Sequence, residues 1–296
     1  ENYLKDKNGV YYLVFNGPVD SGSITIKTIV GADPASFEVV QDFAKDKNHI
    51  YRKDEIITGP DVATFAFLDN GFYQDKDKLY ITSGEYGQNK NLLPVNKDVN
   101  TFHFLPGEGW KSSGYSEDQN GIYFNSELFG EGNLIPNADQ ETFRLFTMDL
   151  PKGSEDLSDH LYNYAYDKNR VYYQGQEIIG ADPLTFVRIN NGVYEYVYGK
   201  DKNGIYYENK LIPGADLQTF EVLWRQVYEG CGKGFYYTKD KNNVYFRDLL
   251  VVGADPATFT TLINSYGKDK NNVYNQGILQ SGLNPNTFIE PTCNYG

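Results

Sequence analysis

Carboxylates are the most abundant groups in this sequence that could do chemistry. The 296 residues include 40 Asp and Glu against 27 Lys and Arg, and the formal net charge is −13. The string Asp-x-Asn-Gly, as at 6–9 and 201–204, is similar to the start of oxygen-rich loops that bind Ca²⁺. Calcium binding is therefore one hypothesis for these acids. A Lys between the two oxygen ligands and the lack of a loop-closing Glu both count against it.

Few other residues have the spacing of a catalytic or metal site. No two of the three histidines, His49, His103 and His160, are spaced as metal ligands. No Gly-x-Ser-x-Gly or Cys/His arrangement occurs, and the glycine-rich stretch 230–234 lacks the Ser or Thr of a P-loop. A pair of carboxylates could act on a substrate, but acids at fixed positions of a repeat are better explained by structure. We therefore expect a protein that is not an enzyme and uses no cofactor.

Charge and hydropathy limit the partners. A net charge of −13 disfavours nucleic acid and anionic membrane surfaces. No run of about 18 apolar residues occurs, so no transmembrane segment is predicted. The first residue is Glu1 rather than Met, which is compatible with a leader or anchor that has been removed. Cys231 and Cys293 could form one disulfide or be two free thiols.

The acids belong to a tandem repeat with two anchor motifs. The first is Asp-Lys-Asn, and we call its first residue the motif Asp: Asp6, Asp46, Asp75, Asp118, Asp167, Asp201, Asp240 and Asp269. The second ends in a Phe: Phe37, Phe65, Phe102, Phe143, Phe186, Phe220, Phe259 and Phe288. The motif Asp and the Phe of the second motif are 19 residues apart in five copies and 25 to 31 residues apart in the other three. The repeats cover approximately 3–42, 43–69, 70–105, 115–148, 164–190, 198–224, 237–263 and 266–291, in a single array over 1–296.

The first motif is interpreted as the turn of a β-hairpin. Gly, Asn or His follows the Asn in six copies, and these residues tolerate a left-handed backbone. This predicts a type I turn with a bulge, in which the motif Asp accepts hydrogen bonds from the turn amides. An aromatic residue stands three positions before each motif Asp. Five positions after it is a Tyr, which we call the motif Tyr: Tyr11, Tyr51, Tyr80, Tyr123, Tyr172, Tyr206, Tyr245 and Tyr274.

The bulged register predicts how these side chains divide between the two faces of the hairpin. It places the aromatic residue and the motif Tyr on one face. The Val, Ile or Leu before the Tyr then points to the other face. Both faces are therefore predicted to be apolar and covered, as in stacked repeats.

The second motif predicts a single capped helical turn. Asp or Asn stands four residues before each Phe, and we call it the cap residue: Asp33, Asp61, Asp98, Asp139, Asp182, Asp216, Asp255 and Asn284. Pro often follows it, and Thr or Ser always precedes the Phe, which is typical of a capped first turn. A short strand is expected after the Phe.

These elements predict an all-β fold of eight small antiparallel hairpin or meander units, each with one capped helical turn. The closest hairpins are 29 residues apart, from Asp46 to Asp75, which we expect to hold three short strands rather than four. We expect the units to stack as an elongated or superhelical, solenoid-like array. A closed β-propeller with short blades is the alternative.

The repeated Asp-Lys-Asn-x-(Val/Ile)-Tyr-Tyr string, complete in copies one, five and six, resembles the bacterial DKNYY family. Other copies depart at the second Tyr, the third reads Asp75-Lys76-Asp77, and the fourth reads Asp118-Gln119-Asn120. The resemblance covers nearly the whole chain. It implies a bacterial, often exported protein in the cell envelope or outside the cell. It implies no activity, cofactor or catalytic residue.

Function is expected where the repeat is interrupted, because insertions in repeat arrays often form the binding site. The inserts are 103–114, 144–163 and 225–236. Our hypothesis is that a protein partner binds residues in or beside them: His103, Trp110, Asp149, Glu155, Asp156, Asp159, His160 and Trp224. An alternative is glycan binding by an exposed ladder of aromatic rings: Tyr12, Phe124, Tyr173, Tyr207 and Phe246. A passive surface or spacer protein is a further alternative.

Overall fold

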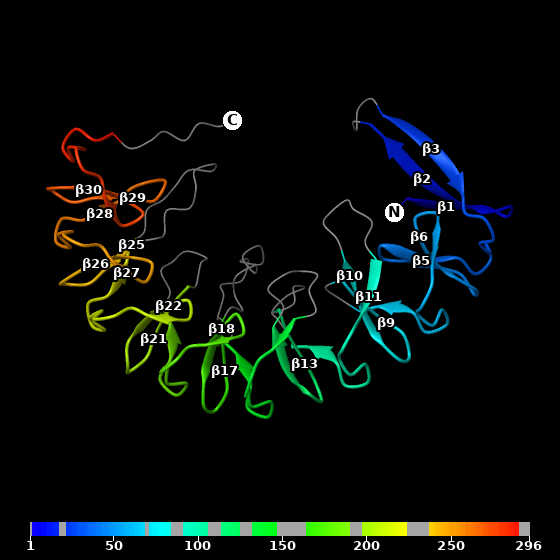
Figure 1. Ribbon diagram of the computed structural model, residues 1–296, viewed down its shortest axis with the longest axis horizontal. Coiled ribbons are helices and arrows are strands. Elements are labelled where there is room, and N and C mark those ends of the chain that lie inside the picture. The colour runs from blue at the N-terminus through cyan, green and yellow to red at the C-terminus, as the bar shows by residue number, and fades with distance from the viewer. Residues whose placement is uncertain are drawn as a thin grey trace, which may run out of the picture. The chain divides into compact units, whose positions relative to one another are not determined.

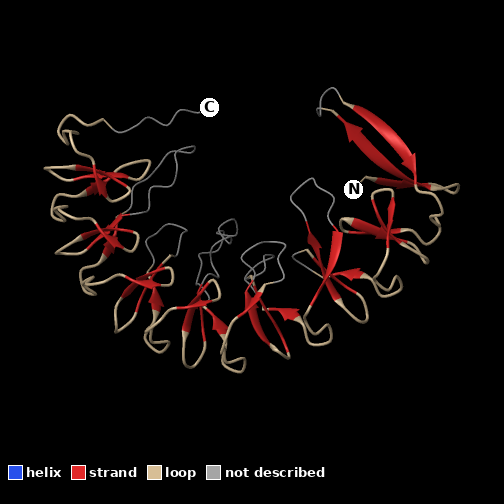
Figure 2. Cartoon of the chain, in the orientation of Figure 1, coloured by secondary structure: helices blue, strands red, loops and turns tan. Residues whose placement is uncertain are grey.

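The computed structural model describes residues 2–17, 22–68, 71–83, 91–105, 114–124, 132–146, 164–189, 197–223 and 237–289. The chain divides into two compact units, which we describe separately. The first covers Glu1–Leu105 and Gly114–Leu134, and the second covers the described residues of Ile135–Gly296. Strands are the only regular elements in the described ranges (Figure 2). No helix there could span a membrane.

The first unit contains four antiparallel sheets, in the orders β1-β2-β3, β4-β5-β6-β7, β8-β9-β10-β11 and β12-β13-β14-β15 (Figure 1). Their strands are β1 Tyr3–Lys5, β2 Val10–Asn16, β3 Ser23–Thr28, β4 Glu38–Val40, β5 Phe43–Lys45, β6 Ile50–Arg52, β7 Glu55–Ile57, β8 Ala66–Phe67, β9 Phe72–Gln74, β10 Leu79–Ser83, β11 Asn91–Val95, β12 His103–Phe104, β13 Tyr115–Asp118, β14 Gly121–Phe124 and β15 Asn133–Leu134.

The second unit contains four further sheets, in the orders β16-β17-β18-β19, β20-β21-β22-β23, β24-β25-β26-β27 and β28-β29-β30-β31. Their strands are β16 Arg144–Leu145, β17 Tyr164–Tyr166, β18 Val171–Tyr173, β19 Gln176–Glu177, β20 Val187–Arg188, β21 Tyr198–Lys200, β22 Ile205–Tyr207, β23 Lys210–Leu211, β24 Glu221–Val222, β25 Tyr237–Lys239, β26 Val244–Phe246, β27 Leu249–Leu250, β28 Thr260–Thr261, β29 Tyr266–Lys268, β30 Val273–Asn275 and β31 Ile278–Leu279. The prediction of eight small antiparallel units in an all-β repeat is confirmed.

The prediction that a compact unit has room for only three strands is wrong. Seven of the eight sheets have four strands, and each is a meander in which neighbours in sequence pair. They fit because the strands are very short. The last sheet uses only two or three residues in each strand and runs from Thr260 to Leu279.

The predicted bulge in the hairpin turn is also wrong, and its absence changes the faces. Of the eight residues that follow the motif Asn, only Gly121 has a positive φ, +154°. Without a bulge the register moves by one residue, which exchanges the two faces of a strand. Tyr198 pairs with Tyr207, and Gly199 pairs with the motif Tyr206. The aromatic residue before the motif Asp therefore shares a face with the residue after the motif Tyr, and not with the motif Tyr itself.

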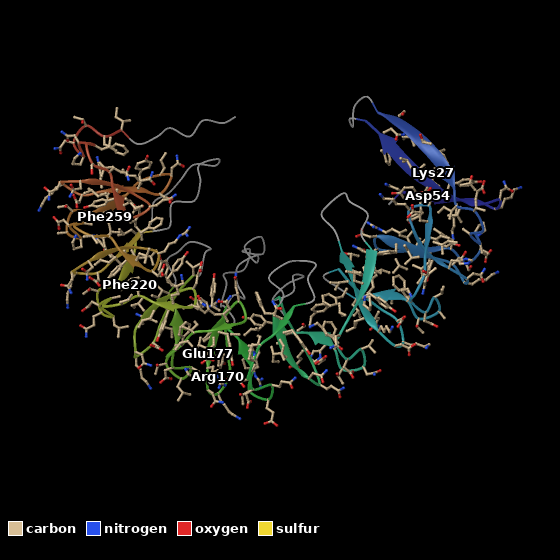
Figure 3. All side chains as sticks on the ribbon, viewed as in Figure 1. Lys27, Asp54, Arg170, Glu177, Phe220 and Phe259 are labelled. Atoms are coloured by element: carbon tan, nitrogen blue, oxygen red, sulfur yellow. The ribbon has the colours of Figure 1, made fainter. Side chains whose placement is uncertain are left out.

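From the second repeat onward both faces of the hairpins are apolar and largely buried, as predicted, whereas the first hairpin is partly exposed. The hydrophobic core lies between successive sheets. There the Phe of the cap turn contacts aromatic rings of both sheets. The ring centroid of Phe186 lies 5.3 Å from that of Tyr164 in β17 and 5.9 Å from that of Tyr206 in β22. Phe220 and Phe259 occupy the equivalent positions further along the second unit (Figure 3). Burying a ring of this size contributes about 1.5–3 kcal/mol.

Small residues opposite the motif Tyr make room for this Phe. A Cβ added to Gly199 would lie 2.2 Å from Cζ of Phe186, and one added to Gly267 would lie 2.4 Å from Cζ of Phe259. Two other copies have Ala44 and Ala165 at this position, both fully buried. The Phe of the cap turn is therefore packed against the backbone of the next sheet.

Candidate functional site

The motif Asp is a buried carboxylate, which makes it the most site-like residue of the repeat. Seven copies are between 0% and 6% exposed: Asp46, Asp75, Asp118, Asp167, Asp201, Asp240 and Asp269. The eighth, Asp6, is exposed. A buried carboxylate needs hydrogen-bond donors, and each of the seven has donors from two successive repeats.

One carboxylate oxygen holds the turn. Oδ1 of the motif Asp accepts a hydrogen bond from the amide two residues later at 2.7–2.8 Å in all eight copies. It also accepts from the next amide, as from Gly204 N–H to Asp201 at 3.0 Å. In a bulged turn these N–H groups would donate to backbone carbonyl oxygens. Here they donate to the side chain of the motif Asp instead.

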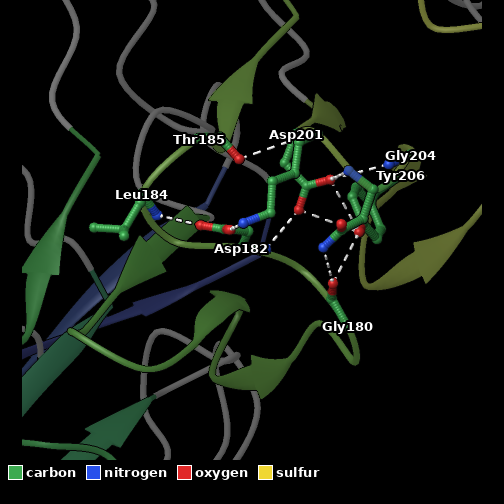
Figure 4. Close-up of polar contacts among 9 residues, drawn as sticks. Gly180, Asp182, Leu184, Thr185, Asp201, Gly204 and Tyr206 are labelled. Atoms are coloured by element: carbon green, nitrogen blue, oxygen red, sulfur yellow. Dashed lines mark hydrogen bonds and ion pairs between the residues drawn. The ribbon is translucent and has the colours of Figure 1, made fainter.

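The other oxygen joins the hairpin to the preceding repeat. Oδ2 accepts the backbone N–H of the preceding cap residue at 2.5–3.0 Å in all seven buried copies. The motif Tyr donates its hydroxyl to the same carboxylate, as Tyr172 does to Asp167 at 2.7 Å. Figure 4 shows this arrangement, with the carboxylate of Asp201 between Asp182 and Tyr206.

Two more kinds of polar contact occur at the boundaries between repeats. The amide after the motif Asp donates to the Thr or Ser hydroxyl of the cap turn at 2.9–3.3 Å. The Lys at that position forms an ion pair with the cap carboxylate in five copies: Lys47–Asp33, Lys168–Asp139, Lys202–Asp182, Lys241–Asp216 and Lys270–Asp255. The cap turn itself is a single turn. Phe186 N–H, for example, donates to Asp182 O at 2.9 Å.

In five of the buried copies the hydrogen bonds favour the ionised form of the motif carboxylate. Burial raises the pKa of Asp167, but the amide of Asp139, the Tyr172 hydroxyl and the turn amides together outweigh it, and the pKa lies below its usual value. The same balance lowers the pKa of Asp46, Asp75, Asp118 and Asp240. The partner hydroxyl shifts the other way: burial and then Asp240 raise the pKa of Tyr245 to about 12.

This geometry does not suit calcium. The carboxylate of Asp167 accepts hydrogen bonds from Asn169 N–H, Arg170 N–H, Tyr172 and Asp139 N–H, which occupy its lone pairs. The described residues include no group of three or more His, Cys, Asp or Glu arranged to hold a metal ion. The motif acids therefore act as joints between repeats.

A second feature is a set of exposed aliphatic side chains on the last strands of successive sheets in the second unit. We call it the aliphatic edge row: Leu211, Leu249, Leu250, Ile278 and Leu279. Their exposed fractions are between 47% and 68%. Leu211, Leu250 and Leu279 have the same place in three consecutive sheets, because each pairs with the motif Tyr of its hairpin.

The row lies at an edge of the sheets. β23, β27 and β31 each pair with only one strand. Polar contacts join neighbouring sheets on this side: Lys210 Nζ lies 3.5 Å from Asp248 Oδ2, and Asn209 donates to Gln176 Oε1 at 2.7 Å. In the first unit the same side has the ion pair Lys27–Asp54 at 2.7 Å (Figure 3).

Of the predicted partner-binding residues, only His103 lies among the described residues. It is on β12 and exposed, with Nε2 2.9 Å from Glu117 Oε1 on the paired strand. Residues Trp110, Asp149, Glu155, Asp156, Asp159, His160 and Trp224, as well as Cys231 and Cys293, lie outside the described residues.

The exposed aromatic ladder predicted for glycans is wrong. Tyr173, Tyr207 and Phe246 are only 7–9% exposed, and Tyr12 and Phe124 are half-buried. In the observed register each of the five faces the aromatic residue on the neighbouring strand, with ring centroids 4.7–5.1 Å apart. These rings form part of the core.

Sequence reasoning missed the aliphatic edge row, although a signal for it exists. An aliphatic residue stands five positions after the motif Tyr in five copies: Ile56, Leu128, Leu211, Leu250 and Leu279. In the described copies this position lies in the short strand that follows a two-residue turn, as in β7, β23, β27 and β31, so the regular spacing indicates a third strand with an outward apolar side chain.

Comparison with protein families decides where the chain belongs. The model of the DKNYY family matches residues 3–159, 116–238 and 237–293, which together span nearly the whole sequence. The chain belongs to the DKNYY family. No curated protein and no solved structure matches it significantly. Family membership confirms the resemblance seen in the Asp-Lys-Asn strings, and the structure shows that the residues naming the DKNYY family build its hairpins.

Proposed function

We propose that this DKNYY protein is a non-enzymatic repeat scaffold that binds a protein partner in the bacterial cell envelope or outside the cell. The aliphatic edge row carries the proposal. Isolated apolar side chains are ordinary on a surface, whereas exposed aliphatic side chains that recur at one place of three successive sheets, as Leu211, Leu250 and Leu279 do, suggest a repeated interaction site. Repetition also gives an extended surface, as in other repeat proteins.

The chemistry of the row favours one kind of partner. Its centre is aliphatic, while the chain as a whole has a net charge of −13. A protein surface with apolar side chains surrounded by Lys and Arg would match both properties, because complementary charge guides association. A partner with a strongly acidic surface would be repelled.

The inserts are a second part of the proposed binding surface. The three inserts, 103–114, 144–163 and 225–236, fall where the first strand of a sheet leads to the second: β12 to β13, β16 to β17, and β24 to β25. The three inserts therefore occur at the same position of the repeat. Insertions at one position of a repeat often lie on one face and form a binding site. The location outside the cytoplasm is inferred from the family resemblance, and the absence of catalysis from the structural use of the motif acids.

Capture of proteins from an envelope extract tests this proposal. A variant with Leu211→Glu, Leu250→Glu and Leu279→Glu is expected to reduce recovery of the partner more than tenfold, because three carboxylates would be placed in the apolar contact. Leu184→Glu is the matched control, since Leu184 is 88% exposed in a cap turn and outside the row. Equal capture by both variants would overturn the role of the row.

A deletion of 149–161 tests the insert separately. The expected result is an unchanged thermal midpoint with weakened capture. A deletion that leaves capture at the level of the unaltered chain would exclude this insert from the binding surface.

A further inference from the structure

We propose that the cap turn at 284–288 of one chain binds the Asp6 hairpin of a second copy, in a head-to-tail contact that repeats the boundary found seven times within the chain. This inference is independent of the proposed function. It concerns the two half-boundaries that the described residues leave without an internal partner.

The last complete boundary shows what a full contact contains. Asp255 N–H donates to Asp269 Oδ2 at 2.8 Å, and Lys270 N–H donates to Thr258 Oγ1 at 3.2 Å. Lys270 Nζ lies 2.9 Å from Asp255 Oδ2. The rings of Phe259 and Tyr274 are in contact, with their centroids 5.9 Å apart.

The hairpin at Asp6 has the receiving half of this contact. Asp6 Oδ1 accepts Asn8 N–H at 2.7 Å and Gly9 N–H at 2.9 Å, so the turn is formed as in the other copies. Within the described residues no cap residue donates to its Oδ2, and Asp6 and Lys7 are exposed. Leu4 is 49% exposed and the motif Tyr11 is half-buried, whereas motif tyrosines in the inner sheets are buried.

The turn at 284–288 has the inserting half. Thr287 N–H and Phe288 N–H donate to Asn284 O at 3.1 and 2.8 Å, and Asn286 N–H donates to Asn284 Oδ1 at 2.9 Å, so this turn is also preformed. In the described part of the chain the Asn284 N–H meets no motif carboxylate, and Asn284 and Thr287 are exposed. Phe288 packs on Tyr266, with the ring centroids 5.4 Å apart. Among the described residues no motif Tyr packs on the other side of the Phe288 ring.

The two halves match group for group. Asn284 N–H would donate to Asp6 Oδ2, Lys7 N–H would donate to Thr287 Oγ1, and Phe288 would cover Tyr11 and Leu4. One difference sets the strength of the contact. The cap residue is Asn284 instead of Asp, so Lys7 would form a hydrogen bond in place of the ion pair found in five internal boundaries. The contact is therefore expected to be reversible, and because it is heterologous each copy could bind a further copy at either end.

Sedimentation velocity of the 296-residue chain over a range of concentrations tests the proposal. The expected result is a mass that rises with concentration beyond a dimer. Lys7→Glu is expected to weaken association, and Asn284→Asp to strengthen it roughly two- to fivefold by restoring the ion pair. Lys7→Glu with Asn284→Lys is expected to recover the association that Lys7→Glu loses. Lys78→Glu, the same change at an exposed Lys of another hairpin, is the control and is expected to have no effect.

Circular dichroism of each variant shows whether it is folded, which is expected since Lys7 and Asn284 are both exposed. A monomer at every concentration would overturn the proposal. Association that responds equally to Lys7→Glu and Lys78→Glu would also overturn it, because the contact would then lie elsewhere.

Discussion

The backbone N–H of Asp216 donates to Oδ2 of Asp240 at 2.9 Å, which joins the cap turn of one repeat to the hairpin of the next. The same carboxylate receives the turn amides through Oδ1 and the Tyr245 hydroxyl through Oδ2. One side chain thus closes its own turn and fixes its neighbour. This double use explains why the motif Asp, the motif Tyr and the cap residue recur together in the DKNYY protein.

Packing between repeats predicts that Gly199→Ala destabilises the protein. The new Cβ would lie 2.2 Å from Cζ of the buried Phe186, so the ring must move between Tyr164 and Tyr206. We expect a loss of about 1–3 kcal/mol, as for other overpacked cores, measured by denaturant unfolding. Ala165→Gly, at the same position of the preceding sheet, is the control and should cost less, about 0.5–1 kcal/mol. A Gly199→Ala protein as stable as the original would show that this boundary is loosely packed.

The motif carboxylates predict a loss of stability in acid. Burial raises the pKa of Asp46, Asp75, Asp118, Asp167 and Asp240, but their hydrogen bonds outweigh it and lower the folded pKa below that of an unfolded Asp, about 3.9. The stability from their ionised form is therefore present above about pH 4 and is lost as the pH falls through the folded pKa. Urea midpoints measured between pH 7 and pH 3 should fall steeply below pH 4. A midpoint independent of pH over this range would contradict the assignment.

The buried tyrosines predict a second loss of stability in alkali. Burial raises the pKa of Tyr123, Tyr237 and Tyr245 to about 12, and an unfolded Tyr ionises near pH 10. The folded state holds these protons more tightly, so the stability they provide is complete below about pH 10 and is lost as the pH rises towards 12. Tyrosinate absorbance and circular dichroism should therefore change together in that range. Ionisation of all tyrosines near pH 10 without unfolding would contradict their burial.

The sequence predicts the repeat, its two anchor motifs and the all-β class, because hairpin turns and caps depend on short-range chemistry. It predicts neither the register nor the number of strands. The residue after the motif Asn tolerates a left-handed backbone, but the side chain of the motif Asp already takes the turn amides, as Asp201 does from Asn203 and Gly204. No bulge is then needed. The shift of one residue moved Tyr207 from a predicted exposed ladder into the core.

The candidate site was harder to predict than the fold. The repeated acids were interpreted as structural, and Asp240 accepts its hydrogen bonds from its own turn, from Tyr245 and from Asp216 of the preceding cap turn. Leu250 and Leu279 were not singled out from the sequence, and they are about half exposed because the last strand of each sheet lies at an edge. Which side of an edge strand is covered depends on packing between repeats, and that information is not local in sequence.

The most direct test of the account compares Asp240→Asn with Asp6→Asn by thermal unfolding at low protein concentration. In Asp240→Asn an amide NH₂ would replace the oxygen that accepts Asp216 N–H, so a partly buried donor loses its acceptor. The expected loss is about 1–3 kcal/mol. Asp6→Asn keeps the Oδ1 acceptor of its turn and has no cap donor within the described chain, so its midpoint should not change. Equal midpoints for the two variants would contradict the claim that the motif Asp joins one repeat to the next.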